Sequence, residues 1–186
     1  DILLSSIRVW VDYGKSVELT DVFNVQSFGA SVGTQGYRRL VGSMHFSSSD
    51  YYHFSQNYVG NNKSFGVGGT ARPNDHLDLN LNVNYVVSYD PQGGTDGRFW
   101  TGSIRTTYLL NKDVFLRVFA QTSANRTYYD QIETHRTILV SGLLGWEFLP
   151  KSTLFLAYNE DRSAPGTHFR LSDRVLVAKV SYFLNR

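Results

Sequence analysis

The stretch His76-Leu-Asp-Leu-Asn-Leu-Asn-Val-Asn-Tyr-Val-Val-Ser-Tyr89 alternates apolar and polar residues almost without a break. Successive side chains of a β-strand point to opposite faces, so the stretch predicts a ribbon with one apolar and one polar face. At about 3.3 Å per residue the ribbon would be roughly 45 Å long, well beyond an ordinary globular strand. A strand this long and this cleanly divided is typical of a wall between lipid and water.

The same alternation recurs along most of the chain, and no segment has a helical period with caps. It predicts about ten strands, near 3–13, 17–32, 37–49, 62–73, 76–89, 98–110, 113–124, 134–148, 152–160 and 173–184. We therefore expect residues 1–186 to form a single all-β domain, an antiparallel up-and-down transmembrane β-barrel. The strands would form either the whole barrel or the C-terminal part of a larger one, and we slightly favour the second.

The predicted connections differ between the two ends of the strands. Tight turns are expected at Gly33–Gly36, Arg72–Asp75, Leu110–Asp113 and Leu149–Ser152. Apart from the short link at Gly14–Ser16, the other links look longer and more polar, at 49–61, 91–97, 124–133 and 159–172. Membrane barrels have this asymmetry, with short periplasmic turns and longer external loops.

In the five predicted strands from 98 to 184, one parity is apolar in its middle and carries charges only at its margins, at Arg98, Arg136, Glu160 and Arg174. A charge at the lipid midplane costs about 2–4 kcal/mol for Arg or Lys, so lipid would exclude charge from this middle. Trp and Tyr near the strand ends suit the membrane interface. The residues predicted to face lipid are Leu77, Leu79, Leu81, Val83, Tyr85, Trp100, Tyr108, Trp146 and Tyr182.

The other parity is polar and is predicted to face a lumen. A small barrel fills its interior with such side chains, whereas a larger barrel leaves an aqueous channel. The residues predicted to face the lumen are Asp78, Asn80, Asn82, Asn84, Arg105, Arg117, Gln121, Glu147, Lys179 and Ser181.

Composition excludes several other classes of protein. The 186 residues hold 18 Lys and Arg against 16 Asp and Glu, a net charge of +2 that argues against a nucleic-acid partner. The absence of Cys excludes disulfides and thiolate chemistry. No apolar run is long enough for a transmembrane helix. The start Asp1-Ile-Leu-Leu4 lacks a basic segment before an apolar one, so we expect a mature chain or a fragment rather than a signal peptide.

Four stretches carry a resemblance to a known family: Arg38–Ser43, Trp146–Pro150, Ser152–Glu160 and Leu171–Leu184. Together they resemble the C-terminal β-barrel of a bacterial outer-membrane family that joins a family 9 carbohydrate-binding-like domain to a domain of unknown function. Members are often described as membrane-associated hydrolases. The resemblance spans most of residues 37–184 and implies a bacterial outer-membrane location.

The last strand also resembles the signal that the barrel insertion machinery reads, with Val180, Tyr182 and Leu184 on one parity, although polar Asn185 and Arg186 follow it. The expected partners are thus the lipid bilayer and, during biogenesis, this machinery. In lipid, the first and last strands must pair with each other, with missing strands or with another envelope subunit.

The sequence contains no strong catalytic motif, and we predict no catalytic residues, metal or cofactor. Glu160 or Asp161 could form an acid/base pair with His168, but a solvated loop is the simpler interpretation. Asp96 could bind calcium, although a Gly-rich turn explains Gly93–Gly97 better. The aromatic cluster Tyr51–Phe54 with Tyr58 could stack on sugars, but loop packing is simpler.

Three functions follow from these patterns. The first is an outer-membrane β-barrel with a pore, transport or scaffold role and a polar lumen. The second is an outer-membrane hydrolase with its site in the external loops. The third is a soluble β-barrel or sandwich with the apolar parity turned inward around an apolar ligand, because alternation alone does not tell inside from outside.

Overall fold

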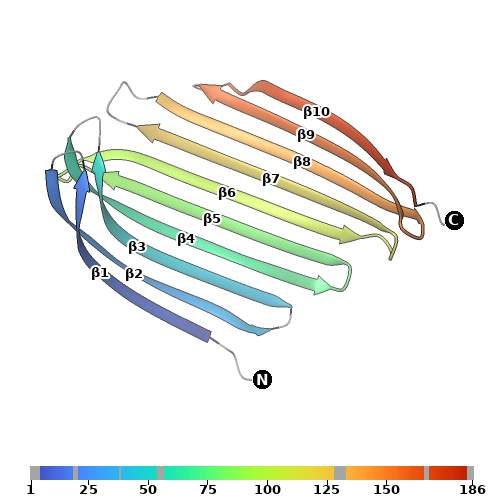
Figure 1. Cartoon of the computed structure of the whole chain (residues 1–186), viewed down its shortest axis with the longest axis horizontal. Helices are drawn as coiled ribbons and strands as arrows, with labels where there is room; N and C mark the ends of the chain where they lie inside the picture. The colour runs from blue at the N-terminus through green and yellow to red at the C-terminus, as the bar shows by residue number, and fades with distance from the viewer. Residues whose placement is uncertain are drawn as a thin grey trace.

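The computed structural model describes residues 5–18, 21–37, 39–53, 57–127, 133–165 and 168–183. They form one antiparallel sheet in which strands follow each other in chain order, an all-β up-and-down arrangement that confirms the prediction (Figure 1). The strands are β1 (Ser5–Glu18), β2 (Asp21–Tyr37), β3 (Leu40–His53), β4 (Tyr58–Asn74), β5 (Leu77–Tyr89), β6 (Thr95–Leu109), β7 (Val114–Thr127), β8 (Glu133–Leu149), β9 (Ser152–Pro165) and β10 (Arg170–Ser181). Within the described ranges, no helix could cross a membrane.

The polar segments that the sequence predicts as long loops are in large part strand. β3 continues to His53, which pairs with Tyr58 at the start of β4, and β7 and β8 continue pairing as far as Thr127 and Glu133. Ladder hydrogen bonds come from the backbone, so a loss of apolar alternation does not end a strand. We call this end of the sheet, with the β1–β2, β3–β4, β5–β6, β7–β8 and β9–β10 connections, the loop end, and the opposite end the turn end.

The turn predicted at Gly33–Gly36 is wrong. β2 continues through this stretch to Tyr37, and the pairing with β3 is irregular between Thr34 and Tyr37. Gly33 remains in the ladder because it pairs with Ser6 on one side and Ser43 on the other. Residues that the sequence assigned to a tight turn therefore lie in an irregularly paired part of β2.

The register divides the sheet into two faces, because directly opposed residues of an antiparallel pair share a face. The apolar face contains Leu81 of β5 and its direct partners Gly69 and Ile104. From there it contains the odd residues of β5 and the even residues of β6 to β10, except where the pairing is irregular near Asp96 and Leu171. The polar face contains Asn80 and its partners Thr70 and Arg105. Each face is continuous across all ten strands.

The described residues form a single-layered sheet without a hydrophobic core. Ala164 is the only apolar residue that is buried in the described part of the chain. Large apolar side chains are exposed instead, for example Ile7 at 75%, Leu81 at 50% and Ile104 at 44%. The apolar face therefore finds no cover within the described residues.

The register is staggered from strand to strand. A row of direct partners that passes through Leu81 begins at Ser5, the first residue of β1, and reaches Arg174 in the loop-end half of β10. Such a stagger accompanies strands that tilt, as barrel closure requires. β1 and β10 lie at opposite edges and do not pair with each other in the described ranges (Figure 1).

Candidate functional site

The structure groups the predicted site residues by face. Those predicted to line a lumen share the polar face: Asp78, Asn80, Asn82 and Asn84 on β5, Arg105 on β6, Arg117 and Gln121 on β7, Glu147 on β8, and Lys179 and Ser181 on β10. Those predicted to face lipid share the apolar face, among them Leu81, Tyr85, Trp100, Tyr108 and Trp146. Leu184, Asn185 and Arg186 of the predicted insertion signal lie outside the described residues.

Arginines gather on the polar face at the turn end. Arg39, Arg72, Arg105 and Arg117 line a hollow of about 900 Å³ together with Asp75, His76 and Asp78. We call this hollow the arginine basin. Its four arginines face two aspartates, so its net charge is positive. The sequence identified Arg105 and Arg117, but Arg72 was missed because it lies in a predicted turn, and Arg39, near the start of the predicted strand 37–49, was not assigned to the lumen.

Hydrogen bonds and ring contacts hold the arginine basin in place. Arg72 Nε lies 2.7 Å from Asp78 Oδ2, and Arg39 donates to the Pro73 carbonyl at 3.3 Å. The Arg105 guanidinium lies 5.4 Å from the centre of the Phe119 ring, and Arg117 lies 5.8 Å from Phe115. Cation–π contacts of this kind orient a guanidinium along a surface without neutralising it. The basin can therefore attract small anions.

A ladder of asparagines extends the polar face from the basin along β5. Asn80 Nδ2 donates to Thr70 Oγ1 at 2.9 Å, and Asn82 Nδ2 donates to Asn80 Oδ1 at 2.8 Å. Because Asn82 bonds Asn80 and Asn80 bonds Thr70, these two amides are oriented by the sheet rather than by solvent. Such a row can line a water-filled surface without fixed charge.

The polar face also carries aromatic rings that lie over glycines of neighbouring strands. A Cβ added at Gly29 would meet the Trp10 ring at 2.2 Å, and one added at Gly145 would meet the Phe115 ring at 2.3 Å. The rings thus lie flat on the sheet and occupy the space that a side chain would need. The sequence did not reveal these contacts, because the pairing of ring and glycine depends on register.

A buried carboxylate lies at the loop end of the polar face. Asp96 is 5% exposed and accepts hydrogen bonds from the hydroxyls of Tyr51, at 2.9 Å, and Tyr58. The neighbouring Gly-rich segment is a turn in which Asp90 Oδ1 accepts from the Gly94 amide at 2.7 Å and Gly93 has a φ of 87°. Tyr51 and Tyr58 of the aromatic cluster therefore pack on Asp96, while Phe54 lies outside the described residues. The described residues hold no group of His, Cys, Asp or Glu that could bind a metal.

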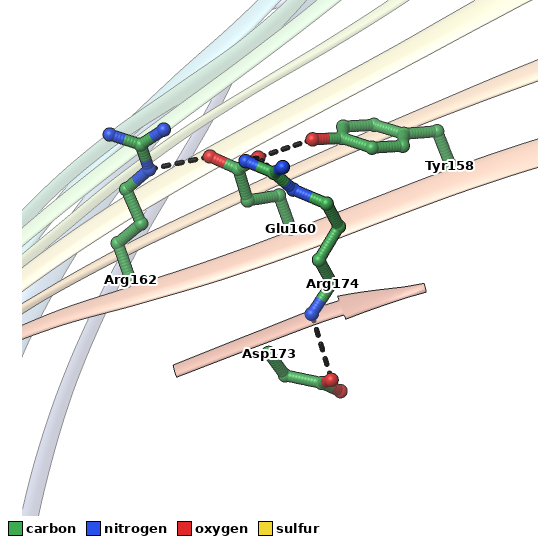
Figure 2. A network of polar contacts seen from close by, with 5 residues as sticks. All are labelled: Tyr158, Glu160, Arg162, Asp173 and Arg174. Atoms are coloured by element: carbon green, nitrogen blue, oxygen red, sulfur yellow. Dashed lines mark hydrogen bonds and ion pairs between the residues drawn. The ribbon is translucent and has the colours of Figure 1, made fainter. Parts of the chain in front are cut away.

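The segment considered for acid/base chemistry forms an ion-pair network on the apolar face. Glu160 accepts hydrogen bonds from Tyr158, Arg162 and Arg174, and the Arg174 Nη2–Glu160 Oε2 distance is 2.8 Å (Figure 2). Glu160 lies beyond the apolar middle of β9, where the Tyr158 hydroxyl and both arginines bond its carboxylate. In the described part of the chain, no hydrogen bond joins His168 to Glu160 or Asp161. Glu160 is thus placed as a structural anion.

Comparison with known proteins adds no relative: the chain matches no family model and no curated protein. Evidence about function therefore comes only from the two faces of the sheet and from the charged residues at their margins.

Proposed function

We propose that this chain forms the wall of a bacterial outer-membrane β-barrel with a pore, transport or scaffold role. In this proposal the apolar face contacts the lipid bilayer and the polar face lines the lumen. The same proposal includes two further points. The chain belongs to the outer-membrane family that carries a carbohydrate-binding-like domain, and the barrel insertion machinery assembles it.

The observation that carries the proposal is the inverted exposure of the two faces. In the middle of β5, Leu81, Val83 and Tyr85 of the apolar face are all exposed, whereas of the polar face only Asn82 is exposed and Asn80 and Asn84 are partly buried. Side chains spread apart on the outer side of a curved sheet and crowd on the inner side. The hollows lined by Arg105 and by Asn82 lie on the polar face, which supports placing that face inside.

The alternative of a soluble barrel requires the opposite curvature. Its apolar side chains would crowd together in the interior, and the rings over Gly29 and Gly145 would lie on the outer surface. An exposed apolar surface that crosses ten strands is far larger than the patches of soluble monomers. A lipid environment accounts for this surface without a further partner.

The unpaired edges place a condition on the proposal. Backbone groups without hydrogen bonds cost several kcal/mol each in lipid, so an open sheet does not span a membrane. β1 and β10 must therefore pair with each other or with further strands. Closure between β1 and β10 gives a small barrel, and additional strands give a wider one with room for an aqueous channel.

The arginine basin gives the lumen a preference for anions. A positively charged ring at one mouth of a pore attracts anions and repels cations. The asparagine ladder above it provides hydrogen-bond donors and acceptors without adding charge. We therefore propose anion preference if the lumen is open.

The three tryptophans provide a direct test of the facing. Trp100 and Trp146 lie on the apolar face near its two margins, while Trp10 lies on the polar face opposite Gly29. Single-tryptophan variants made with Trp→Phe changes would be folded into vesicles whose acyl chains carry bromine near the headgroup. We expect strong fluorescence quenching of Trp100 and Trp146 and little quenching of Trp10.

Two outcomes would contradict the proposal. Quenching of Trp10 alone would reverse the facing. A protein that stays monodisperse in buffer without detergent and shows no quenching of any tryptophan would favour the soluble barrel.

A further inference from the structure

The polar face is not polar everywhere, because a strip of apolar side chains crosses β7 to β10 in its turn-end half. The strip consists of Phe115, Leu143, Phe155, Ala157 and Val177. Leu143, Ala157 and Val177 are direct partners in one row that begins at Arg117. In the next row towards the turn end, Phe115 and Phe155 lie on either side of Gly145. We call these five residues the apolar strip.

Ring contacts make the apolar strip continuous. The ring centroids of Phe115 and Phe155 lie 6.5 Å apart, and the Phe115 ring fills the space above Gly145. Leu143 and Phe155 are partly exposed, and Val177 is 48% exposed. The described residues form a single-layered sheet, so none of them lies over the strip. A ligand that removes this apolar surface from water would gain binding free energy.

Two guanidinium groups border the apolar strip at its β7 side. Arg117 is the direct partner of Leu143, and the Arg105 guanidinium lies 5.4 Å from the centre of the Phe119 ring beside it. Both arginines line the arginine basin. The turn-end halves of β5 to β8 belong entirely to the described ranges, and no ion pair there joins Arg105 or Arg117 to a carboxylate. The two guanidinium groups are therefore available to an anionic ligand.

Other charges around the apolar strip restrict where an anionic group can lie. Towards the loop end, Asp161 and Asp173 are direct partners on the polar face and would repel an anion. At the β10 side, Lys179 is the direct partner of Phe155 and contributes one ammonium group. Two guanidinium groups can bind a carboxylate through paired hydrogen bonds, which an ammonium group cannot do. The β7 side is therefore the favoured place for a carboxylate.

We propose that the apolar strip and its two arginines bind an amphiphilic carboxylate, a small acid with an acyl chain. Its carboxylate lies at Arg105 and Arg117, and its chain crosses the strip towards Val177. From β7 to β10 the strip covers three strand spacings, roughly 14 Å at about 4.8 Å each, which suits the extended chain of laurate. The hollow at the charged end, about 900 Å³, has the size of a small-molecule site.

The inference rests on the proposed function, because the strip faces a lumen only if the apolar face meets lipid. It narrows the proposed anion preference to one class of solute. An inorganic anion would leave the strip in contact with water, and an uncharged alkane would leave both guanidinium groups without a partner.

The test places a fluorescent reporter in the apolar strip. Phe155→Trp is combined with Trp→Phe changes at the three native tryptophans, and the protein is folded into phosphatidylcholine vesicles. Laurate brominated near its methyl end is titrated at neutral pH, and the fluorescence of the introduced tryptophan is followed. Separate vesicles of brominated phosphatidylcholine, without laurate, report whether position 155 faces lipid. Gel mobility with and without heating checks that each variant is folded.

We expect saturable quenching by brominated laurate and little quenching by brominated phosphatidylcholine. Unlabelled laurate should reverse the quenching. Acetate lacks the chain and dodecanol lacks the carboxylate, so each should need at least a tenfold higher concentration to compete.

The charged end is tested with Arg105→Gln/Arg117→Gln, added to the reporter variant. We expect brominated laurate to bind roughly tenfold more weakly, a loss of about 1.4 kcal/mol. The matched control is Arg8→Gln/Lys112→Gln, which removes two positive charges from β1 and from the β6–β7 turn. The control should bind laurate as the reporter variant does.

The apolar end is tested independently of charge with two leucines on the same face of β8. Leu143→Gln should weaken laurate binding several-fold, because the chain loses apolar contact. Leu139→Gln is the matched control, since Leu139 lies outside the strip, between Gln121 and Asp161, and should have little effect.

The site would be overturned by the absence of saturable quenching, or by equal effects of a test variant and its matched control. In each case a reporter that brominated phosphatidylcholine does not quench would leave the proposed function intact. Strong quenching of the reporter by brominated phosphatidylcholine would instead overturn the proposed facing and the site together.

Discussion

The apolar and polar faces are built on one backbone, yet they meet their surroundings in different ways. On the apolar face, large side chains such as Ile7 and Leu81 extend outward and are exposed. On the polar face, amides bond one another and rings lie flat over glycines. On the polar face, side chains of the sheet contact one another, whereas the apolar side chains need contacts from outside the sheet. That division is the reverse of a soluble fold.

The largest expected effect comes from placing the same charge on each face. Leu81→Arg and Asn82→Arg alter neighbouring exposed residues of β5 that point to opposite faces. If the apolar face meets lipid, Leu81→Arg should reduce the stability of the inserted protein by about 2–4 kcal/mol, while Asn82→Arg should have little effect. Folding into vesicles, followed by gel mobility with and without heating, measures the difference. Equal losses for the two variants would contradict the assignment of the faces.

A smaller effect should separate two glycines of β8. A Cβ at Gly145 on the polar face would meet the Phe115 ring at 2.3 Å, whereas one at Gly142 on the apolar face meets nothing within 4 Å. Gly145→Ala should therefore destabilise the protein by about 1 kcal/mol, because the ring must move. Gly142→Ala should be neutral or slightly stabilising, because it restricts the unfolded chain. Urea unfolding of both variants in the same detergent measures the comparison, and a larger loss for Gly142→Ala would contradict it.

The smallest effect concerns the ion-pair network on the apolar face, in which Arg162 and Arg174 share Glu160. The Glu160 carboxylate must be ionised to pair with both arginines, so its stabilising contribution is lost when acid protonates it. Glu160→Gln should lower the unfolding midpoint at neutral pH and flatten the decline on the acid side. Unfolding midpoints at a series of pH values test this. Parallel pH curves for the variant and the unaltered protein would show that Glu160 does not contribute.

Much of the fold could be predicted from the sequence, since a period of two is a local property. On β5, the odd residues such as Leu81 were predicted to share one face and the even residues such as Asn82 the other. The pairing of β5 with its neighbours has the same division. The ends of the strands could not be predicted from the sequence, because backbone pairing continues where the apolar–polar alternation stops. The stretch at Gly33–Gly36 has the composition of a turn, yet it pairs on both sides as part of β2.

The candidate sites depended on register, which no local pattern contains. Arg98 and Arg126 are distant in the chain and are brought opposite each other by the β6–β7 ladder. Arg174 meets Glu160 in the same way, although the pairing of β9 and β10 shifts between Leu171 and Asp173. A register change of one residue would move each of these side chains to the other face.

The sequence by itself determined that there are two faces and which residues belong to each, because side-chain direction alternates with every residue of a strand. Only the tertiary structure decided which residues are neighbours across strands and which face is the more exposed. Both depend on pairing between distant segments and on the curvature of the whole sheet. The arginine basin exists only at that level.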